Sequence, residues 1–188
     1  MFLQPNSSPT EGTRSQCESL AFIACAHAIA AQAHRGQKRS DGQDYIEHPI
    51  EVARNLLDVG LTDPQQLAAA YLHDALEKGP AAIRGLIEQD LGSEVLALVD
   101  ELTDDPSMSS HGRRGHQLDR AASMSLAARQ IKLADRLANL RSPRPDWTLE
   151  QRQRYAIHSY ALLEVLQGSH DDLEAQLRQR LSLPAWRL

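Results

Sequence analysis

The adjacent pair His73–Asp74 is the feature of this sequence best suited to chemistry. Apolar residues flank it on both sides, in the order AAAYLHDALEK. An imidazole and a carboxylate in such a setting need partners if they are buried, and both are groups that bind divalent transition metals. A His-Asp dipeptide also arises often by chance, so a purely structural role stays open for the pair taken alone.

Two further candidate ligands lie far from this pair in the chain. His34 closes an alanine-rich segment, and Asp135 lies within the apolar run IKLADRLANL. If their helices converge, these two residues and the pair form a four-ligand metal site. Glu77 follows His73 by four residues and Asp74 by three, so on a helix it shares their face. There it would hold a metal-bound water and take its proton; the alternative is a solvated glutamate at a helix end.

The elements that must position these residues are predicted to be helices. The chain has 27 Leu and 25 Ala but only 13 Val and Ile together, and aromatic residues make up 4%. Leu and Ala favour helices, whereas strands are rich in β-branched and aromatic residues. We therefore expect an all-α protein with about eight helices, at 17–34, 49–59, 64–78, 81–91, 93–102, 117–141, 148–167 and 170–181, and a polar loop at 103–116.

The length of 188 residues suggests a single domain. We expect it at 17–183, after a flexible N-terminal segment at 1–16 that is rich in Pro, Ser and Thr. The formal net charge of −5 disfavours a general nucleic-acid binder but leaves room for local basic pockets.

The sequence shows no membrane span and no secretory signal. The two cysteines, Cys17 and Cys25, lie too far apart on one helix to form a disulfide with each other. We therefore expect a cytoplasmic protein whose partner is a small molecule, with no nucleic acid and no membrane involved. The alanine-rich helix face leaves a homo-oligomer possible.

Four ordered segments together resemble one known family. They are AHRGQKRSDGQDYIEHPIEVA (33–53), YLHDALE (71–77), LTDD (102–105) and IKLADRLANLRS (131–142). These segments resemble the HD-domain phosphohydrolases and, more narrowly, the hydrolase domain of the Rel/Spo alarmone enzymes in its stand-alone form, the small alarmone hydrolases, which include the Mesh-like enzymes. The resemblance covers roughly residues 17–168 and implies an all-α HD-domain helical bundle.

The resemblance also implies a metal, a ligand set and a reaction. The metal is one ion per chain, usually Mn²⁺, and its ligands fall on His34, His73, Asp74 and Asp135. The reaction is hydrolysis of the 3′-diphosphate of guanosine tetra- or pentaphosphate (ppGpp or pppGpp) to GDP or GTP plus pyrophosphate. The chemistry of the residues agrees, because a divalent ion polarises a phosphoryl oxygen and lowers the pKa of bound water.

Positions expected to bind the substrate follow from the same resemblance. For each there is a plainer alternative: a solvated basic loop, a polar residue at a helix end, or a core tyrosine. His48 in YIEHP also matches the family, but we expect it, like Tyr45, to have a structural role in tying the loop to the next helix. The predicted substrate-binding residues are Lys38, Arg39, Asn139, Ser142 and Tyr155.

The sequence departs from the family at Lys78. The family motif runs His-Asp-x-x-Glu-Asp, with two acids thought to activate the water, whereas here Glu77 is followed by a lysine. In one interpretation Lys78 is a cation in the last turn of a helix, pointing outward. In the other it reaches the site, where it would bind phosphate but oppose proton abstraction by Glu77. The predicted catalytic residues are Glu77 and Lys78.

The expected function is therefore that of a Mn²⁺-dependent alarmone 3′-pyrophosphohydrolase without a synthetase domain. Two alternatives remain open. One is an HD phosphohydrolase that acts on another nucleotide, for example as an NADPH phosphatase, because Mesh-type relatives act on NADPH. The other is a module that binds an alarmone with little turnover.

Overall fold

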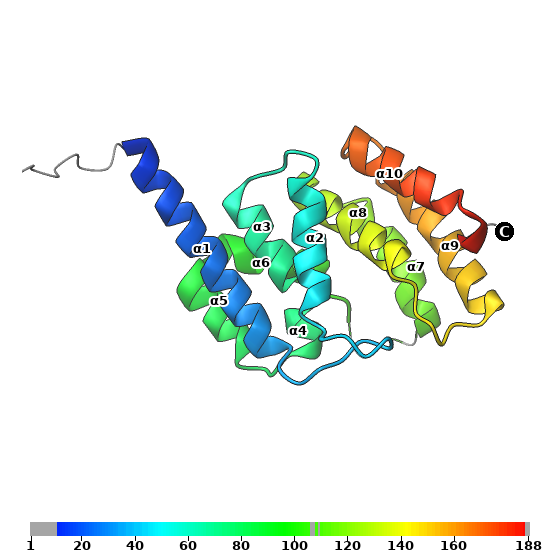
Figure 1. The fold of residues 1–188 in the computed structure, drawn as a ribbon, viewed down its shortest axis with the longest axis horizontal. Coiled ribbons are helices and arrows are strands. Elements are labelled where there is room, and N and C mark those ends of the chain that lie inside the picture. Colours follow the sequence, from blue (N-terminus) through cyan, green and yellow to red (C-terminus); the bar gives the residue numbers. More distant parts are fainter. Residues whose placement is uncertain (1–10, 106–107, 109, 187–188) are drawn as a thin grey trace, which may run out of the picture.

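The computed structural model describes residues 11–105, 108 and 110–186. Over these residues the chain forms ten α-helices and a short 3-10 turn at Pro184–Trp186, with a single isolated β-bridge and no strand (Figure 1). The predicted all-α fold is confirmed. The helices are α1 (Glu11–Ala33), α2 (Glu47–Leu57), α3 (Pro64–Leu72), α4 (Ala75–Lys78), α5 (Ile83–Leu91), α6 (Ser93–Leu102), α7 (Ser110–Ala121), α8 (Leu126–Arg141), α9 (Leu149–Val165) and α10 (Asp171–Leu181).

Only part of the N-terminal segment expected to be flexible, residues 1–16, is described by the structure. Residues 1–10 lie outside the described part of the chain. Residues 11–16 belong to α1, which therefore begins before the expected start at residue 17.

The single helix expected at 64–78 is wrong, because the chain turns at His73–Asp74. Asp63 caps α3 by accepting the backbone N–H of Gln66 at 2.8 Å. α3 then ends at Leu72, and α4 begins at Ala75 after Asp74 with φ −103° and ψ −5°. The pair thus lies at a helix break rather than on one continuous helical face.

The long helix expected at 117–141 is also divided, and part of the expected loop at 103–116 is helical. α7 begins at Ser110, and α8 begins after Ser125, whose hydroxyl accepts the Ala128 N–H at 3.3 Å. The Arg120 guanidinium holds α7 against the end of α6 by donating to the Thr103 carbonyl at 2.7 Å. Sequence periodicity did not reveal this contact between distant segments.

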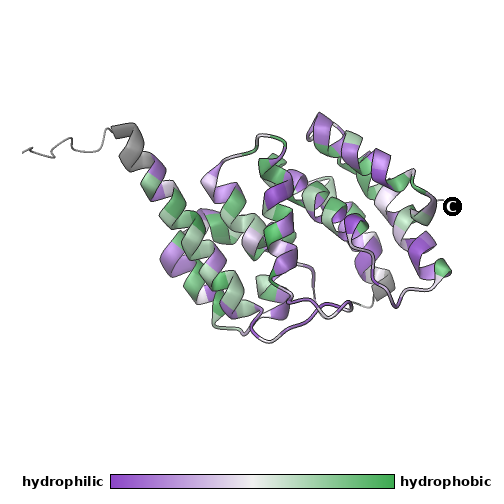
Figure 2. Ribbon diagram, viewed as in Figure 1, coloured by the Kyte–Doolittle hydropathy of each residue, from purple (hydrophilic) through white to green (hydrophobic). Residues whose placement is uncertain are grey.

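The helices pack around α3 and α8. α3 contacts α1, α2 and α6, whereas α8 contacts α2, α6 and α10. Three successive alanines of α3, Ala68 to Ala70, are fully buried, and their small side chains let the neighbouring helices approach closely. Figure 2 shows the apolar residues concentrated where helices face one another. This packing brings the end of α1, the start of α2, the α3–α4 break and the middle of α8 to one place.

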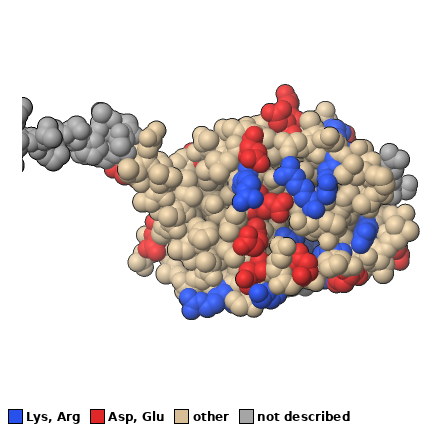
Figure 3. Space-filling model, viewed as in Figure 1, with Lys and Arg blue, Asp and Glu red and all other residues tan. Residues whose placement is uncertain are grey.

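The surface carries mixed charge. Figure 3 shows acidic and basic side chains next to one another across the face in view, with several basic groups gathered on its right half. Within the described ranges, none of the helices has the length and apolar character needed to cross a membrane.

Candidate active site

The converging elements enclose an inner pocket of about 230 Å³. One ligand atom each from His48, His73 and Asp74 lies within 4.8 Å of the others. Asp135 joins them from α8, with its Oδ1 3.1 Å from His48 Nε2 and 3.8 Å from His73 Nε2. Three of the four predicted metal ligands, His73, Asp74 and Asp135, are therefore together.

The His73 ring has the tautomer that a metal ligand requires, with the proton on Nδ1 and Nε2 available. Its Nδ1 lies 2.9 Å from the Ala70 carbonyl, so Nδ1 carries the proton and donates it. Its Nε2 is buried and has no hydrogen-bond partner within the described structure. Burial also lowers the pKa of His73. A histidine that donates through one ring nitrogen and keeps the other free is the usual arrangement of a metal ligand.

His34 has the same arrangement at the edge of the cluster. It follows α1 directly, its Nδ1 lies 3.0 Å from Gln37 Oε1, and its Nε2 is buried without a hydrogen-bond partner in the described chain. Its ring lies against that of Tyr45, with 4.8 Å between the centroids. Burial lowers the pKa of His34, and the charge of nearby Asp74 opposes that shift. His34 is not one of the three residues whose ligand atoms lie within 4.8 Å of one another.

His48 and Tyr45 were expected to be structural, and the structure places both against the predicted ligands. His48 is 3% exposed, and its Nε2 approaches Asp135 at 3.1 Å. The Tyr45 hydroxyl donates a short hydrogen bond to Asp74 Oδ2. The signal that sequence reasoning passed over is their spacing of three residues across the turn that leads into α2, where the His48 backbone N–H donates to the Tyr45 carbonyl at 3.1 Å.

The two aspartates are ionised. Burial disfavours the charge on Asp74, but the neighbouring His73 and Lys78 outweigh it and hold the pKa of this carboxyl well below its usual range. The pKa of Asp135 is also lowered, because its hydrogen bond with His48 and the neighbouring histidines outweigh burial. Asn139 fixes Asp135 by donating to its Oδ1 at 2.7 Å.

Glu77 lines the same pocket. Its Oε1 accepts the backbone N–H of Asp104 at 2.6 Å, and Gln117 in turn donates to the Asp104 carboxylate. Burial raises the pKa of Glu77 above that of an ordinary glutamate. A raised pKa makes the carboxylate a stronger base near neutral pH.

Lys78 reaches the site, so the interpretation of an outward-pointing cap is wrong. Its Nζ lies 2.8 Å from Asp74 Oδ1 and 3.7 Å from Glu77 Oε2. Gln37 holds the Lys78 backbone by donating to its carbonyl at 2.7 Å. The next residue, Gly79, packs so closely that a Cβ there would lie 2.5 Å from the Ala75 carbonyl oxygen, to which the Gly79 N–H donates at 2.9 Å.

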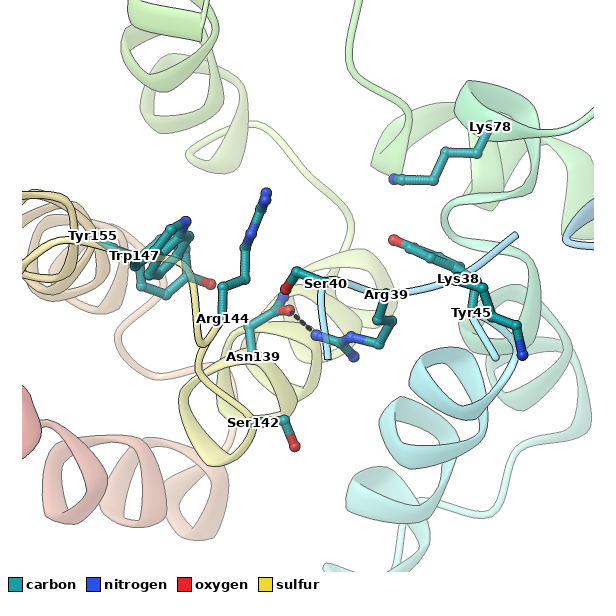
Figure 4. Close-up of a pocket in the computed structure, with 10 residues that line it drawn as sticks. All are labelled: Lys38, Arg39, Ser40, Tyr45, Lys78, Asn139, Ser142, Arg144, Trp147 and Tyr155. Atoms are coloured by element: carbon teal, nitrogen blue, oxygen red, sulfur yellow. Dashed lines mark hydrogen bonds between the residues drawn. The ribbon is translucent and has the colours of Figure 1, made fainter. Parts of the chain in front are cut away.

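An outer pocket of about 470 Å³ adjoins the inner one. Tyr45, Lys78 and Asn139 line both pockets. In Figure 4, Lys78 and Tyr45 lie on one side, Trp147 and Tyr155 on the other, and Arg39 and Asn139 between them. All five predicted substrate-binding residues line this pocket: Lys38, Arg39, Asn139, Ser142 and Tyr155.

The outer pocket combines cations with aromatic rings. Arg39 donates to Asn139 Oδ1 at 3.2 Å, whereas Lys38 pairs with the exposed Asp44 at 2.8 Å. The Trp147 and Tyr155 rings lie 4.8 Å apart between centroids. Sequence reasoning did not select Trp147, although it is one of only two tryptophans in the chain.

Most of the motif residues therefore meet at one site, and all of them lie within a stretch of the chain that matches a known family. The sequence profile described as "HD domain" matches residues 26–168. The chain belongs to the HD-domain family. This match contains the four segments that carry the resemblance, from the loop after α1 to the end of α8.

Named relatives of this HD domain are alarmone hydrolases. The chain is 37% identical over 166 residues to the guanosine-3′,5′-bis(diphosphate) 3′-pyrophosphohydrolase MESH1 of Drosophila melanogaster, covering 85% of this chain and 92% of the relative. It is 38% identical over 157 residues to human MESH1, covering 80% and 87%. A solved structure of a metazoan orthologue of SpoT that hydrolyses ppGpp superposes with a TM-score of 0.80 at 32% identity, covering 94% and 97%.

Proposed function

We propose that this protein hydrolyses the 3′-diphosphate of ppGpp or pppGpp, releasing pyrophosphate and GDP or GTP. The observation that carries the proposal is the junction of the two pockets. The inner one holds imidazole groups, carboxylates and a glutamate of raised pKa, and the outer one holds cations and two aromatic rings in contact. Relatives over most of the chain length are named for the same reaction, which supports the assignment.

The residues present fit a divalent metal, and we propose Mn²⁺. At this site, buried ring nitrogens of His34, His48 and His73 lack a hydrogen-bond partner among the described residues. The carboxylates of Asp74 and Asp135 lie beside His73 Nε2, at 3.6 and 3.8 Å. We propose His34, His73, Asp74 and Asp135 as the ligands. Such an ion supplies a polarised phosphoryl oxygen and a water of lowered pKa. His48 already donates to Asp135, so we assign it the role of orienting that ligand.

The proposed metal site makes His34 a ligand and His48 a residue that orients a ligand. The test is Mn²⁺ affinity, measured by titration calorimetry on His34→Ala and on His48→Ala. We expect loss of binding in His34→Ala and a weakening of about 10- to 100-fold in His48→Ala, the usual cost of losing an orienting partner. Loss of binding in His48→Ala with full affinity in His34→Ala would instead make His48 the ligand.

The remaining steps belong to side chains of this chain. The diphosphate to be cleaved lies in the inner pocket, where Glu77 takes a proton from the attacking water. Lys38, Arg39 and Lys78 neutralise phosphate oxygens, because charge-assisted hydrogen bonds are strong. Asn139, Ser142 and Tyr155 contact the nucleoside part of the substrate, and the Trp147 ring offers a stacking surface beside them.

The test of the substrate class is a panel of nucleotides with product analysis. Purified protein with Mn²⁺ is given ppGpp, pppGpp and NADPH, and pyrophosphate and orthophosphate are measured separately. We expect pyrophosphate from the two guanosine compounds. Orthophosphate from NADPH alone would contradict the proposal and favour the phosphatase alternative.

The binding-module alternative has one observation in its favour, the lysine where the family has a second acid. Its signature is tight ppGpp binding with no product, together with turnover in Lys78→Asp. Because Glu77 and all four proposed ligands are present, we expect turnover in the wild type.

A further inference from the structure

The ammonium group of Lys78 lies at the junction of the inner and outer pockets. Its Nζ lies 2.8 Å from Asp74 Oδ1 and 3.7 Å from Glu77 Oε2. Its side chain is 35% exposed and lines both the inner and the outer pocket. Within the described part of the chain it is the only lysine or arginine that lines both.

The contact on Asp74 leaves the ammonium group with unused hydrogen-bond capacity. Asp74 uses Oδ1 for Lys78, whereas its Oδ2 receives the Tyr45 hydroxyl and faces His73 Nε2 at 3.6 Å. The oxygen nearer the histidines is therefore not the one that Lys78 holds. An ammonium group has three N–H donors, so the partial exposure of Lys78 leaves donors for an anion at the pocket junction.

Two contacts position Lys78, one at its ammonium group and one at its backbone. The Tyr45 ring lies under Nζ, with 5.3 Å from the nitrogen to the centroid. The Gln37 side chain holds the Lys78 backbone. These contacts keep a full positive charge close to a carboxylate that is a proposed metal ligand. A positive charge there opposes binding of a divalent cation and favours binding of phosphate.

We propose that the Lys78 ammonium group binds Asp74 through Oδ1 and donates its other N–H groups to a terminal phosphate. Its positive charge thereby lowers the affinity of the site for the metal and raises its affinity for phosphate. This inference rests on the proposed function, because it takes Asp74 as a metal ligand and a phosphate ester as substrate. It makes Lys78 a specificity-determining residue for substrates that end in a phosphate or diphosphate.

The proposal predicts opposite shifts in two affinities. In Lys78→Met we expect Mn²⁺ to bind about tenfold tighter and inorganic pyrophosphate to bind the metal-free protein about tenfold more weakly, since one nearby unit charge is removed. Lys78→Arg keeps the charge and should keep both wild-type affinities within about threefold. Both are measured by titration calorimetry, with circular dichroism to show that each variant keeps its helices.

A matched control removes the same charge elsewhere. Arg84→Met breaks the surface pair with Asp100, in which the nitrogen and oxygen lie 2.5 Å apart, and should leave both affinities unchanged. Equal or weaker Mn²⁺ binding in Lys78→Met would overturn the proposal, because a residue that merely braces Asp74 would weaken the metal when removed. Unchanged pyrophosphate binding would overturn it as well.

These titrations contain no alarmone, so their outcome does not depend on whether the protein hydrolyses ppGpp. Opposite shifts without ppGpp hydrolysis would overturn the substrate assignment and support the role of Lys78. Hydrolysis of ppGpp without opposite shifts would support the reaction and overturn that role.

Discussion

The inner and outer pockets share a wall and differ in how their side chains are held. In the inner pocket, His48 and His73 are at most 6% exposed, and both they and the two aspartates have protein partners. In the outer pocket, the Lys38 side chain is 57% exposed and that of Arg144 is 52% exposed. The inner pocket is therefore built for fixed geometry and the outer one for adjustable contact.

This difference indicates a division of labour between the pockets. Residues that act on a reacting atom need an orientation that is fixed before the substrate arrives, and partners such as Gln37, Ala70 and Asp104 provide it. Residues that recognise a flexible nucleotide gain from side chains that can follow it. We therefore expect substitutions in the inner pocket to reduce kcat and metal binding, and substitutions in the outer pocket to raise KM.

The largest expected effect is at Asp135. Asp135→Ala removes a proposed metal ligand together with the acceptor of the Asn139 hydrogen bond. We expect Mn²⁺ binding and ppGpp hydrolysis both to be lost, as measured by calorimetry and product release. The matched control is Asp119→Ala, at an exposed position of α7, which should retain both. Full metal binding in Asp135→Ala would contradict the ligand assignment.

The next largest effect is expected at Glu77, where a substitution should reduce catalysis without reducing metal binding. Glu77→Gln still offers an oxygen to the Asp104 N–H but no longer accepts a proton. We expect kcat to fall by about 10²- to 10⁴-fold, the usual range for a general base, with Mn²⁺ affinity retained. Glu88→Gln, at an exposed position of α5, is the control.

The pH profile gives Glu77 a second test. A base acts only when it is ionised, so activity should fall as the pH drops through the pKa of Glu77, which burial raises above that of an ordinary glutamate. Glu77→Gln should lose this acid limb of kcat/KM. An unchanged limb in the variant would assign the titration to another group.

A smaller effect is expected in the outer pocket. Arg39→Met removes a guanidinium that faces Asn139 and, in the proposed complex, a phosphate. We expect KM for ppGpp to rise about tenfold, in line with the value of a charged hydrogen bond, with kcat within about threefold of the wild type. Arg35→Met, on the same loop but outside both pockets, should behave as wild type. A fall in kcat at constant KM would break the division of labour.

The smallest effect is expected at Tyr155. Burial raises the pKa of Tyr155 to about 12, so its hydroxyl stays neutral and contributes only a neutral hydrogen bond. Tyr155→Phe keeps the ring that packs against Trp147 and should raise KM by no more than about fivefold. A tenfold or larger change in kcat would place the hydroxyl among the reacting groups.

The sequence was sufficient to predict the fold class and to select most of the residues that meet at the candidate site. Leucine and alanine content predicted an all-α fold, and His73, Asp74, Asp135 and Glu77 stood out as polar residues within apolar runs. The two divided helices were not predictable in this way. Strong helix formers such as Ala, Leu and Glu lie on both sides of His73–Asp74, so helix propensity alone predicts one helix, whereas the structure interrupts it at this pair.

The contacts of individual site residues, such as Lys78 and His48, could not be predicted from the sequence either. The inward direction of Lys78 goes with contacts to Asp74 and to the Tyr45 ring, and the Tyr45 ring comes from a distant loop. His48 was passed over because a histidine just before a proline at a helix start has an ordinary structural explanation. Only the approach of α2 to α8 brings it to Asp135.

The central claim is metal-dependent removal of pyrophosphate from ppGpp at this site. The most direct test is steady-state hydrolysis of ppGpp by the purified protein, following GDP and pyrophosphate, first after chelator treatment and then with Mn²⁺ restored. The account predicts no product without metal and equal amounts of GDP and pyrophosphate with Mn²⁺. No product with Mn²⁺ bound and the fold intact would contradict it.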